Sequence, residues 1–174
     1  MKHRILCALL IALLACALAA PAMAEIALTP DNFQYCFNVC AGVEWDDTYT
    51  RCSSLFKMNG APAYSDAGTG KTVYKSVDNR TVYIFQADAS GVCETIEIVM
   101  DLTDNSPSKN FPAYCAMLAL SSQWLETQDF ADMLGWYSDS TGNSDYHTTT
   151  IGRFTLETVS ISNCTSFLRL TVNS

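Results

Sequence analysis

The sequence has few of the residues that most often carry catalysis or bind metals. It contains two histidines, His3 and His147, and no two cysteines separated by two residues, so the ligand spacing of a structural zinc site is missing. No G-x-S-x-G motif marks a nucleophile elbow. No motif therefore assigns a catalytic, cofactor-binding or metal-binding residue, and no cofactor is expected.

Basic residues are also scarce. The chain has 10 Lys and Arg against 18 Asp and Glu, which gives a formal net charge of −8 at pH 7. Like charges repel, so an acidic chain of this kind disfavours contact with nucleic acid and with anionic membrane surfaces. The expected partner is an unknown protein or a small ligand.

Long apolar runs are absent except at the N-terminus, where the run has the form of a secretory signal peptide. Residues 2–4 are basic, residues 5–20 are apolar, and residues 22–24 place small side chains where signal peptidase reads them. The run is shorter than the roughly 20 residues that a transmembrane helix needs. We expect cleavage between Ala24 and Glu25, and a periplasmic or secreted protein without a transmembrane anchor.

A lipoprotein signal is the minor alternative. Cys16 follows Leu13-Leu14-Ala15 in a loose likeness of a lipidation box. The apolar run continues beyond Cys16, however, and the small-residue site at 22–24 is cleaner. The expected organisation is therefore a cleavable leader over 1–24 and one domain over 25–174. Loss of two basic residues leaves 8 against 18 acidic ones, a net charge of −10.

Six cysteines follow the leader, and an even number in an exported chain indicates disulfide bonds. We expect up to three bonds, with buried free thiols as the alternative. Six cysteines allow about 15 complete pairings, and the sequence does not choose among them. The candidates are Cys36, Cys40, Cys52, Cys93, Cys115 and Cys164.

The periodicity of apolar residues predicts an α+β fold. The expected elements are a helix over 29–43, strands over 71–77, 80–87 and 92–101, helices over 111–126 and 128–137, and strands over about 148–160 and 164–172. Turns are expected at 78–79 and 88–91, and a loop over 59–70. The prediction is an antiparallel sheet of about five strands with helices packed on one face, in the order α-βββ-α-ββ, stabilised by disulfides.

Alternation assigns the faces of the strand over 92–101. Ile96, Ile98 and Met100 are expected on one face, and Cys93, Thr95, Glu97 and Val99 on the other. In the first helix, Cys36 and Cys40 lie on the same apolar stripe and are expected to face the core.

Two segments resemble ligand-binding loops without the context that such loops need. Residues 65–72 differ from a P-loop at Ser65, and a β-type stretch follows where a helix is required. Residues 139–145 offer oxygen ligands, but Ser144 and Thr150 stand where a calcium loop has glycine and glutamate. Both are interpreted as polar loops.

The leading hypothesis is an exported, non-enzymatic binding or protein-interaction domain. Aromatic side chains in or beside loops are candidate contacts, with coverage of the core edges as the alternative. They are Trp45, Tyr49, Trp136, Tyr137 and Tyr146. The other hypotheses are a structural or assembly protein, and a secreted hydrolase whose site assembles from distant residues. For the hydrolase the candidates are Asp145, His147, Arg153 and Glu157.

Overall fold

A computed structural model describes residues 26–42, 54–101, 110–140, 145–161 and 165–173. The expected leader, Cys52, Cys164, Trp45 and Tyr49 lie outside the described residues. In chain order the elements are α2 (Pro30–Ala41), β1 (Tyr64–Asp66), β2 (Lys71–Lys75), β3 (Thr81–Ala87), β4 (Cys93–Asp101), α4 (Phe111–Gln123), α5 (Thr127–Ser140), β5 (His147–Ile151), β6 (Phe154–Ile161) and β7 (Thr165–Val172).

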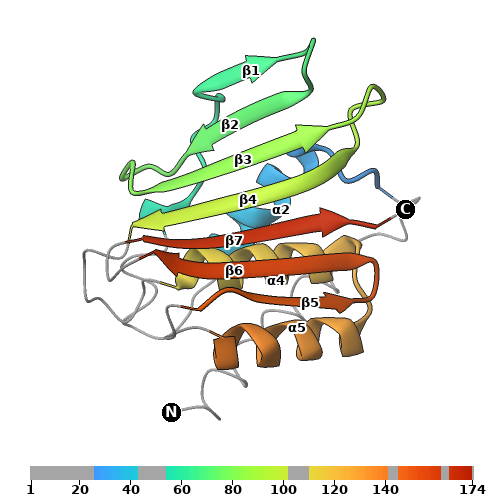
Figure 1. Cartoon of the computed structure of the whole chain (residues 1–174). Coiled ribbons are helices and arrows are strands. Elements are labelled where there is room, and N and C mark those ends of the chain that lie inside the picture. Colours follow the sequence, from blue (N-terminus) through green and yellow to red (C-terminus); the bar gives the residue numbers. More distant parts are fainter. Residues whose placement is uncertain (1–25, 43–53, 102–109, 141–144, 162–164, 174) are drawn as a thin grey trace.

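The seven strands form one antiparallel sheet in the order β1-β2-β3-β4-β7-β6-β5 (Figure 1). Helices α2 and α4 lie behind this sheet in the view of Figure 1, and α5 lies below β5 at the edge of the sheet. The α+β class and the antiparallel sheet are thus confirmed. None of the helices in the described ranges is long and apolar enough to cross a bilayer.

Helix α2 begins where the sequence predicts it. The side chain of Thr29 accepts a hydrogen bond from the backbone N–H of Asn32 at 3.2 Å, and Pro30 occupies the first turn. Phe33, Phe37 and Cys40 are buried on one stripe of the helix. The apolar periodicity therefore packs α2 against the sheet and α4.

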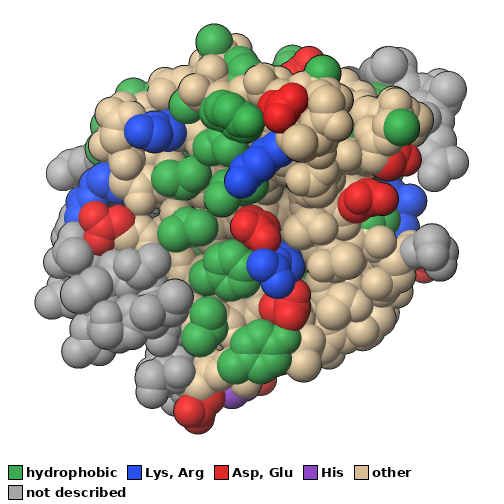
Figure 2. Space-filling model, turned by 45° about the horizontal axis from the view of Figure 1, so that its top comes forward, with side chains coloured by type: hydrophobic (Ala, Val, Ile, Leu, Met, Phe, Trp, Pro, Cys, Tyr) green, Lys and Arg blue, Asp and Glu red, His purple; other side chains and the backbone are tan. Residues whose placement is uncertain are grey.

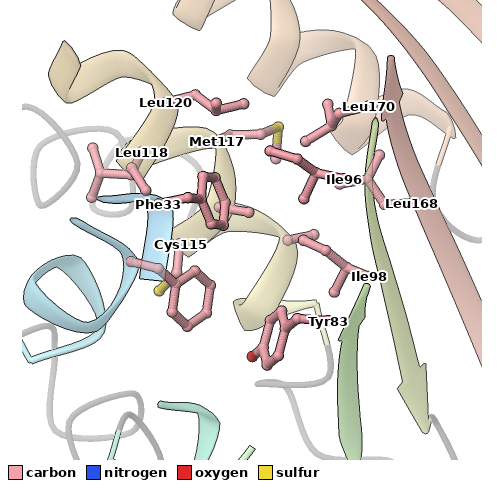
Figure 3. Packing of buried hydrophobic residues seen from close by; sticks show 14 of the residues in the cluster. Phe33, Tyr83, Ile96, Ile98, Cys115, Met117, Leu118, Leu120, Leu168 and Leu170 are labelled. Atoms are coloured by element: carbon pink, nitrogen blue, oxygen red, sulfur yellow. The ribbon is translucent and has the colours of Figure 1, made fainter. Parts of the chain in front are cut away.

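Helix α4 occupies the centre of the helical layer. Its residues from Phe111 to Leu120 are buried except Tyr114, because the helix is covered on nearly all sides. Figure 3 shows Met117 and Leu120 of α4 in the same core as Ile96 of β4 and Leu170 of β7. The core thus lies between the helices and the middle strands.

The sheet has seven strands instead of the expected five or so. Strand β1 lies within the expected loop over 59–70, where three residues pair with β2. The expected strand over 148–160 is a hairpin of β5 and β6, because Gly152 has φ of 54° and reverses the chain. A glycine at the first turn position of a two-residue hairpin matches the strand twist.

The expected face of Cys93 is wrong. The register of β3 and β4 shifts between Gln86 and Ala87, which pair with Thr95 and Cys93. The bulge leaves Glu94 as an extra residue, so alternation reverses and Cys93 faces the core, where it is 1 % exposed. Beyond the bulge the prediction is confirmed, since Ile96, Ile98 and Met100 are buried.

The expected disulfide bonds are not seen among the four cysteines that the structure describes. Cys52 and Cys164 lie outside the described residues and can pair with at most two of the other four cysteines. Three bonds would therefore require at least one bond among Cys36, Cys40, Cys93 and Cys115, and these four form none with one another. Burial raises the pKa of Cys93 to about 12, with the charge of Asp88 adding to the effect. Burial also raises the pKa of Cys115 well above its ordinary value. Both behave as small core side chains.

Candidate functional site

The candidate site is the open face of the sheet, which we define as the face opposite α2, α4 and α5. Figure 2 looks obliquely onto this face and shows a band of hydrophobic side chains beside acidic and basic ones. Side chains alternate along each strand, so every second residue of β2, β3, β4, β7 and β6 points to this face. Among the described residues, no helix lies on it.

An ion triad crosses the middle of the open face. Glu97 of β4, Arg169 of β7 and Glu157 of β6 are directly opposite one another in the sheet register. Nε and Nη2 of Arg169 lie 2.9 and 2.8 Å from Oε1 of Glu97, and Nη1 lies 3.5 Å from Oε2 of Glu157. Two carboxylates on neighbouring strands thus hold one guanidinium in place.

Arg169 is fixed from a third side by an aromatic ring. Its guanidinium carbon lies 5.1 Å from the ring centroid of Phe167. Partial burial opposes its charge, but the hydrogen bond and charge of Glu97, followed by those of Glu157, raise the pKa of Arg169 above its ordinary value. The side chain is still 41 % exposed. A rigid, charged and accessible planar group therefore stands in the middle of the face.

Tyr146 extends the triad toward the edge of the sheet. Its hydroxyl donates a hydrogen bond to Oε1 of Glu157, and this bond raises the pKa of Tyr146. The side chain is 58 % exposed. Tyr146 is thus the sequence-predicted interaction aromatic that the structure brings to the open face.

One half of the face is apolar. Val82, Val99, Phe167 and Val159 lie side by side on β3, β4, β7 and β6. Val73 and Ile84 adjoin this row on β2 and β3. All six side chains are half-buried. We call these six residues the apolar half.

The other half is polar and hollowed. A depression of about 370 Å³ is lined by Lys71, Ile84, Gln86, Thr95, Glu97, Glu157, Arg169 and Thr171. Threonines continue the row beyond it, since Thr171 pairs with Thr155 and Thr155 with Thr150. The hydroxyls of Thr150 and Thr155 lie 3.1 Å apart. Ligands in this half would meet fixed hydroxyl, amide and charged groups.

The open face is balanced in charge although the chain is acidic. The register places four anions on it, Asp66, Glu97, Asp101 and Glu157, and three cations, Lys71, Lys75 and Arg169. Arg80, whose Nε lies 3.8 Å from Oδ2 of Asp101, adds a fourth cation. The complete chain has a formal net charge of −8. The excess of acidic residues therefore lies elsewhere.

The four hydrolase candidates do not come together. His147 pairs with Thr158, which faces the helices, whereas Glu157 faces the opposite side of the sheet. Nε2 of His147 is buried and has no hydrogen-bond partner among the residues that the structure describes. Arg153 lies in the β5–β6 turn, 5.5 Å from the ring of Phe154, and Asp145 is exposed before β5. Glu157 joins the ion triad instead.

The two other candidate aromatics within the described residues, Tyr137 and Trp136, belong to α5 and lie away from the open face. Tyr137 is 0 % exposed in the core, where its ring meets that of Tyr114 at a centroid distance of 5.5 Å. Trp136 is half-buried against the core. Reasoning from the sequence missed Arg169, Glu97 and the apolar half. Alternation along the strands was the available signal for their common face.

The P-loop-like segment is a hairpin. Residues 65 and 66 belong to β1 and residues 71 and 72 to β2, and no helix follows. The carboxylate of Asp66 accepts hydrogen bonds from the turn at Gly68 and Thr69, which lower its pKa. The calcium-loop-like segment lies partly outside the described residues. Within the described ranges, no cluster of three metal-binding side chains occurs.

Comparison with protein-family models, with curated proteins and with solved structures finds no match to this chain.

Proposed function

We propose that this chain is an exported, non-enzymatic interaction domain, and that a protein partner binds the open face of its sheet. The leader pattern over 1–24 supports export. The observation that carries the proposal is the composition of the open face: a half-apolar, charge-balanced surface on an acidic chain, with an immobilised arginine at its centre.

The composition agrees with what protein interfaces use. Their buried centres are depleted in net charge, and arginine and aromatic residues are enriched among the side chains that contribute most to binding. Arg169 is already ordered by Glu97, Glu157 and Phe167. Binding therefore costs little additional side-chain entropy at this position.

A protein partner is favoured over a small ligand. Small-molecule sites enclose most of the ligand surface in a concave pocket. The depression beside Arg169 is open to solvent and shares the face with the flat apolar half. The favourable contact area is thus spread over five strands.

Site-specific photo-cross-linking in the exporting host tests the proposal. Phe167 on the open face is replaced by p-benzoylphenylalanine, and the matched control replaces Val77, which is 51 % exposed in the turn after β2. We expect an ultraviolet-dependent protein adduct from position 167 and none from position 77. Mass spectrometry identifies the adduct.

Equal adducts at both positions, or no adduct at 167, would overturn the proposal. Thermal melts of the two substituted proteins establish beforehand that both are folded. A small-molecule ligand would leave position 167 without a protein adduct, so this outcome also separates the two kinds of partner.

A further inference from the structure

We infer that β5 binds an extended segment of a different protein, which adds to the sheet as an eighth strand. Among the described strands β5 is at the edge of the sheet, with β6 on one side only (Figure 1). This edge is a second site beside the open face, because it binds through the backbone of one strand and not through the side chains of five. Addition of a strand to a sheet edge is a general mode of peptide recognition.

The register shows which backbone groups of β5 point to the edge. The two-residue turn at 152–153 makes Ile151 and Phe154 a hydrogen-bonded pair. Backbone groups alternate in direction along a strand, so the N–H and C=O groups of Thr148 and Thr150 point away from β6. Both residues are exposed, and no residue that the structure describes makes a hydrogen bond to these backbone groups. An extended backbone is the partner that satisfies them.

The opposite edge of the sheet is protected against such pairing, whereas β5 is not. Natural edge strands are protected by shortness, proline, charged side chains or bulges. Strand β1 has three residues, follows Pro62 and ends at Asp66. Strand β5 has five residues, His147–Ile151, without Pro, Lys, Arg, Asp or Glu, and its register with β6 is unbroken. Such an edge is expected where addition of a strand has a function.

Helix α5 supplies a floor for the added strand, since it lies below β5 in Figure 1. A Cβ on Gly152 would lie 2.3 Å from Oδ2 of Asp129, so this side of α5 meets the β5–β6 turn. Trp136 lies two turns further along the same side, which is about 10 Å along the helix and about three residues along β5. Its half-buried ring is therefore near the level of Thr149, below the edge.

The charge of α5 favours a single segment over a second copy of the chain. Asp129, Asp132, Trp136 and Asp139 follow one side of the helix, and α5 contains no Lys or Arg. Pairing β5 with the β5 of a second copy would bring two such acidic helices side by side, where they repel each other. A lone segment brings no helix. We therefore expect an apolar side chain over Trp136 and Lys or Arg beside the aspartates.

Photo-cross-linking in the exporting host tests the inference. Thr148 is replaced by p-benzoylphenylalanine in chains that keep Thr150 or carry Thr150→Pro or Thr150→Val. Proline removes the outward N–H without removing a hydrogen bond to β6, and valine keeps the N–H but removes the hydroxyl. We expect an adduct of a different protein that is unchanged by valine and reduced about tenfold or more by proline. The link should map to one segment of that protein, containing Lys or Arg.

Four results would overturn the inference: no adduct from position 148, equal adducts with and without proline, equal losses with proline and valine, or an adduct of the chain with itself. The last result would identify a second copy as the occupant. Thermal melts establish beforehand that each variant is folded.

Amide hydrogen exchange of the unsubstituted protein tests the edge without any variant. In the isolated protein the amides of Thr148 and Thr150 should exchange about 100-fold or more faster than that of Thr149, whose N–H points to β6. Similar protection of all three amides would mean that the edge is covered, and would refute the inference even if Thr150→Pro does not fold.

The outcomes also separate the edge from the open face, on which the side chain of Thr148 lies. Thr150→Pro should leave the adduct from position 167 unchanged. A single protein captured from positions 148 and 167, with or without proline, overturns the edge site and leaves the proposed function standing. A proline-sensitive adduct from position 148 with none from position 167 does the reverse.

Discussion

The buried thiols of Cys93 and Cys115 give a quantitative prediction about cysteine chemistry. With a pKa of about 12 for Cys93, about one thiol in 10⁴ is ionised at pH 8, whereas roughly a quarter of exposed thiols with a pKa of about 8.5 are ionised. Only the thiolate reacts rapidly with alkylating reagents. The native protein should therefore alkylate at Cys93 on the order of 10³ times more slowly than the unfolded chain.

Pulsed alkylation with iodoacetamide, followed by mass spectrometry of the peptides, measures this ratio. Cys115 should be at least as slow, because it is completely buried and its pKa is also raised by burial. Labelling after unfolding in guanidinium without reductant provides the control, since free thiols then react fully.

Two results would refute the reasoning. Rapid labelling of Cys93 in the native protein would contradict its burial at the bulge of β4. If Cys93 or Cys115 is labelled after unfolding only when a reductant is added, that cysteine is in a disulfide bond. The disulfide prediction from the even cysteine count would then be right, and the described packing of that thiol would be wrong.

Two further predictions concern stability. The side chain of Asn38 accepts a hydrogen bond from the N–H of Met58 at 2.8 Å and donates one to the carbonyl of Met58 at 3.0 Å, so Asn38→Ala should lower the free energy of unfolding by about 2 kcal/mol. The control is Gln34→Ala, one turn away, whose half-buried side chain makes a single hydrogen bond to the carbonyl of Asn59 and should cost about 0.5 kcal/mol. Equal losses in denaturant titrations would contradict this. Gly70→Ala should lower stability by more than about 2 kcal/mol, because φ is 69° and a Cβ would lie 2.1 Å from the carbonyl oxygen that ends β3. At Gly135 in α5 an added Cβ would have no atom within 4 Å, so Gly135→Ala should raise the free energy of unfolding by up to about 1 kcal/mol. If thermal melts show that Gly70→Ala and Gly135→Ala change stability in the same direction, the argument is refuted.

Local periodicity correctly predicted those helices and strands whose apolar face is defined without reference to the element it packs against. The stripe of Phe33, Phe37 and Cys40 defines a helix face whatever it packs against, and the alternation of Ile96 and Ile98 defines a strand face. Both follow from backbone geometry over a few residues. These predictions therefore agree with the structure.

Features that depend on pairing were beyond local reasoning. Strand β1 has three residues and exists because it pairs with β2, and the reversal at Gly152 lies within a stretch that otherwise favours strand. The bulge that turns Cys93 inward follows from the register between β3 and β4. A register shift depends on how two strands pair, so it cannot be predicted from the sequence of one strand.

The candidate site was hidden for the same reason. Glu97 and Arg169 are 72 residues apart in the chain and become neighbours because β7 lies beside β4. The sequence analysis named Glu157 as a candidate hydrolase residue and Tyr146 as a candidate interaction aromatic, without linking the two. Their hydrogen bond and their common link to the triad depend on how β6 and β7 pair.

The position of β7 also has a consequence for how the protein is made. Strands β1–β4 and β5–β6 are joined into one sheet through β7, residues 165–172, which is the last of the seven strands in the chain. A chain that emerges N-terminus first from a ribosome or a translocation channel therefore cannot close its sheet until this final strand is available. Closure of the sheet is therefore a late event with a high contact order, and export as proposed above would move a chain whose sheet is still open.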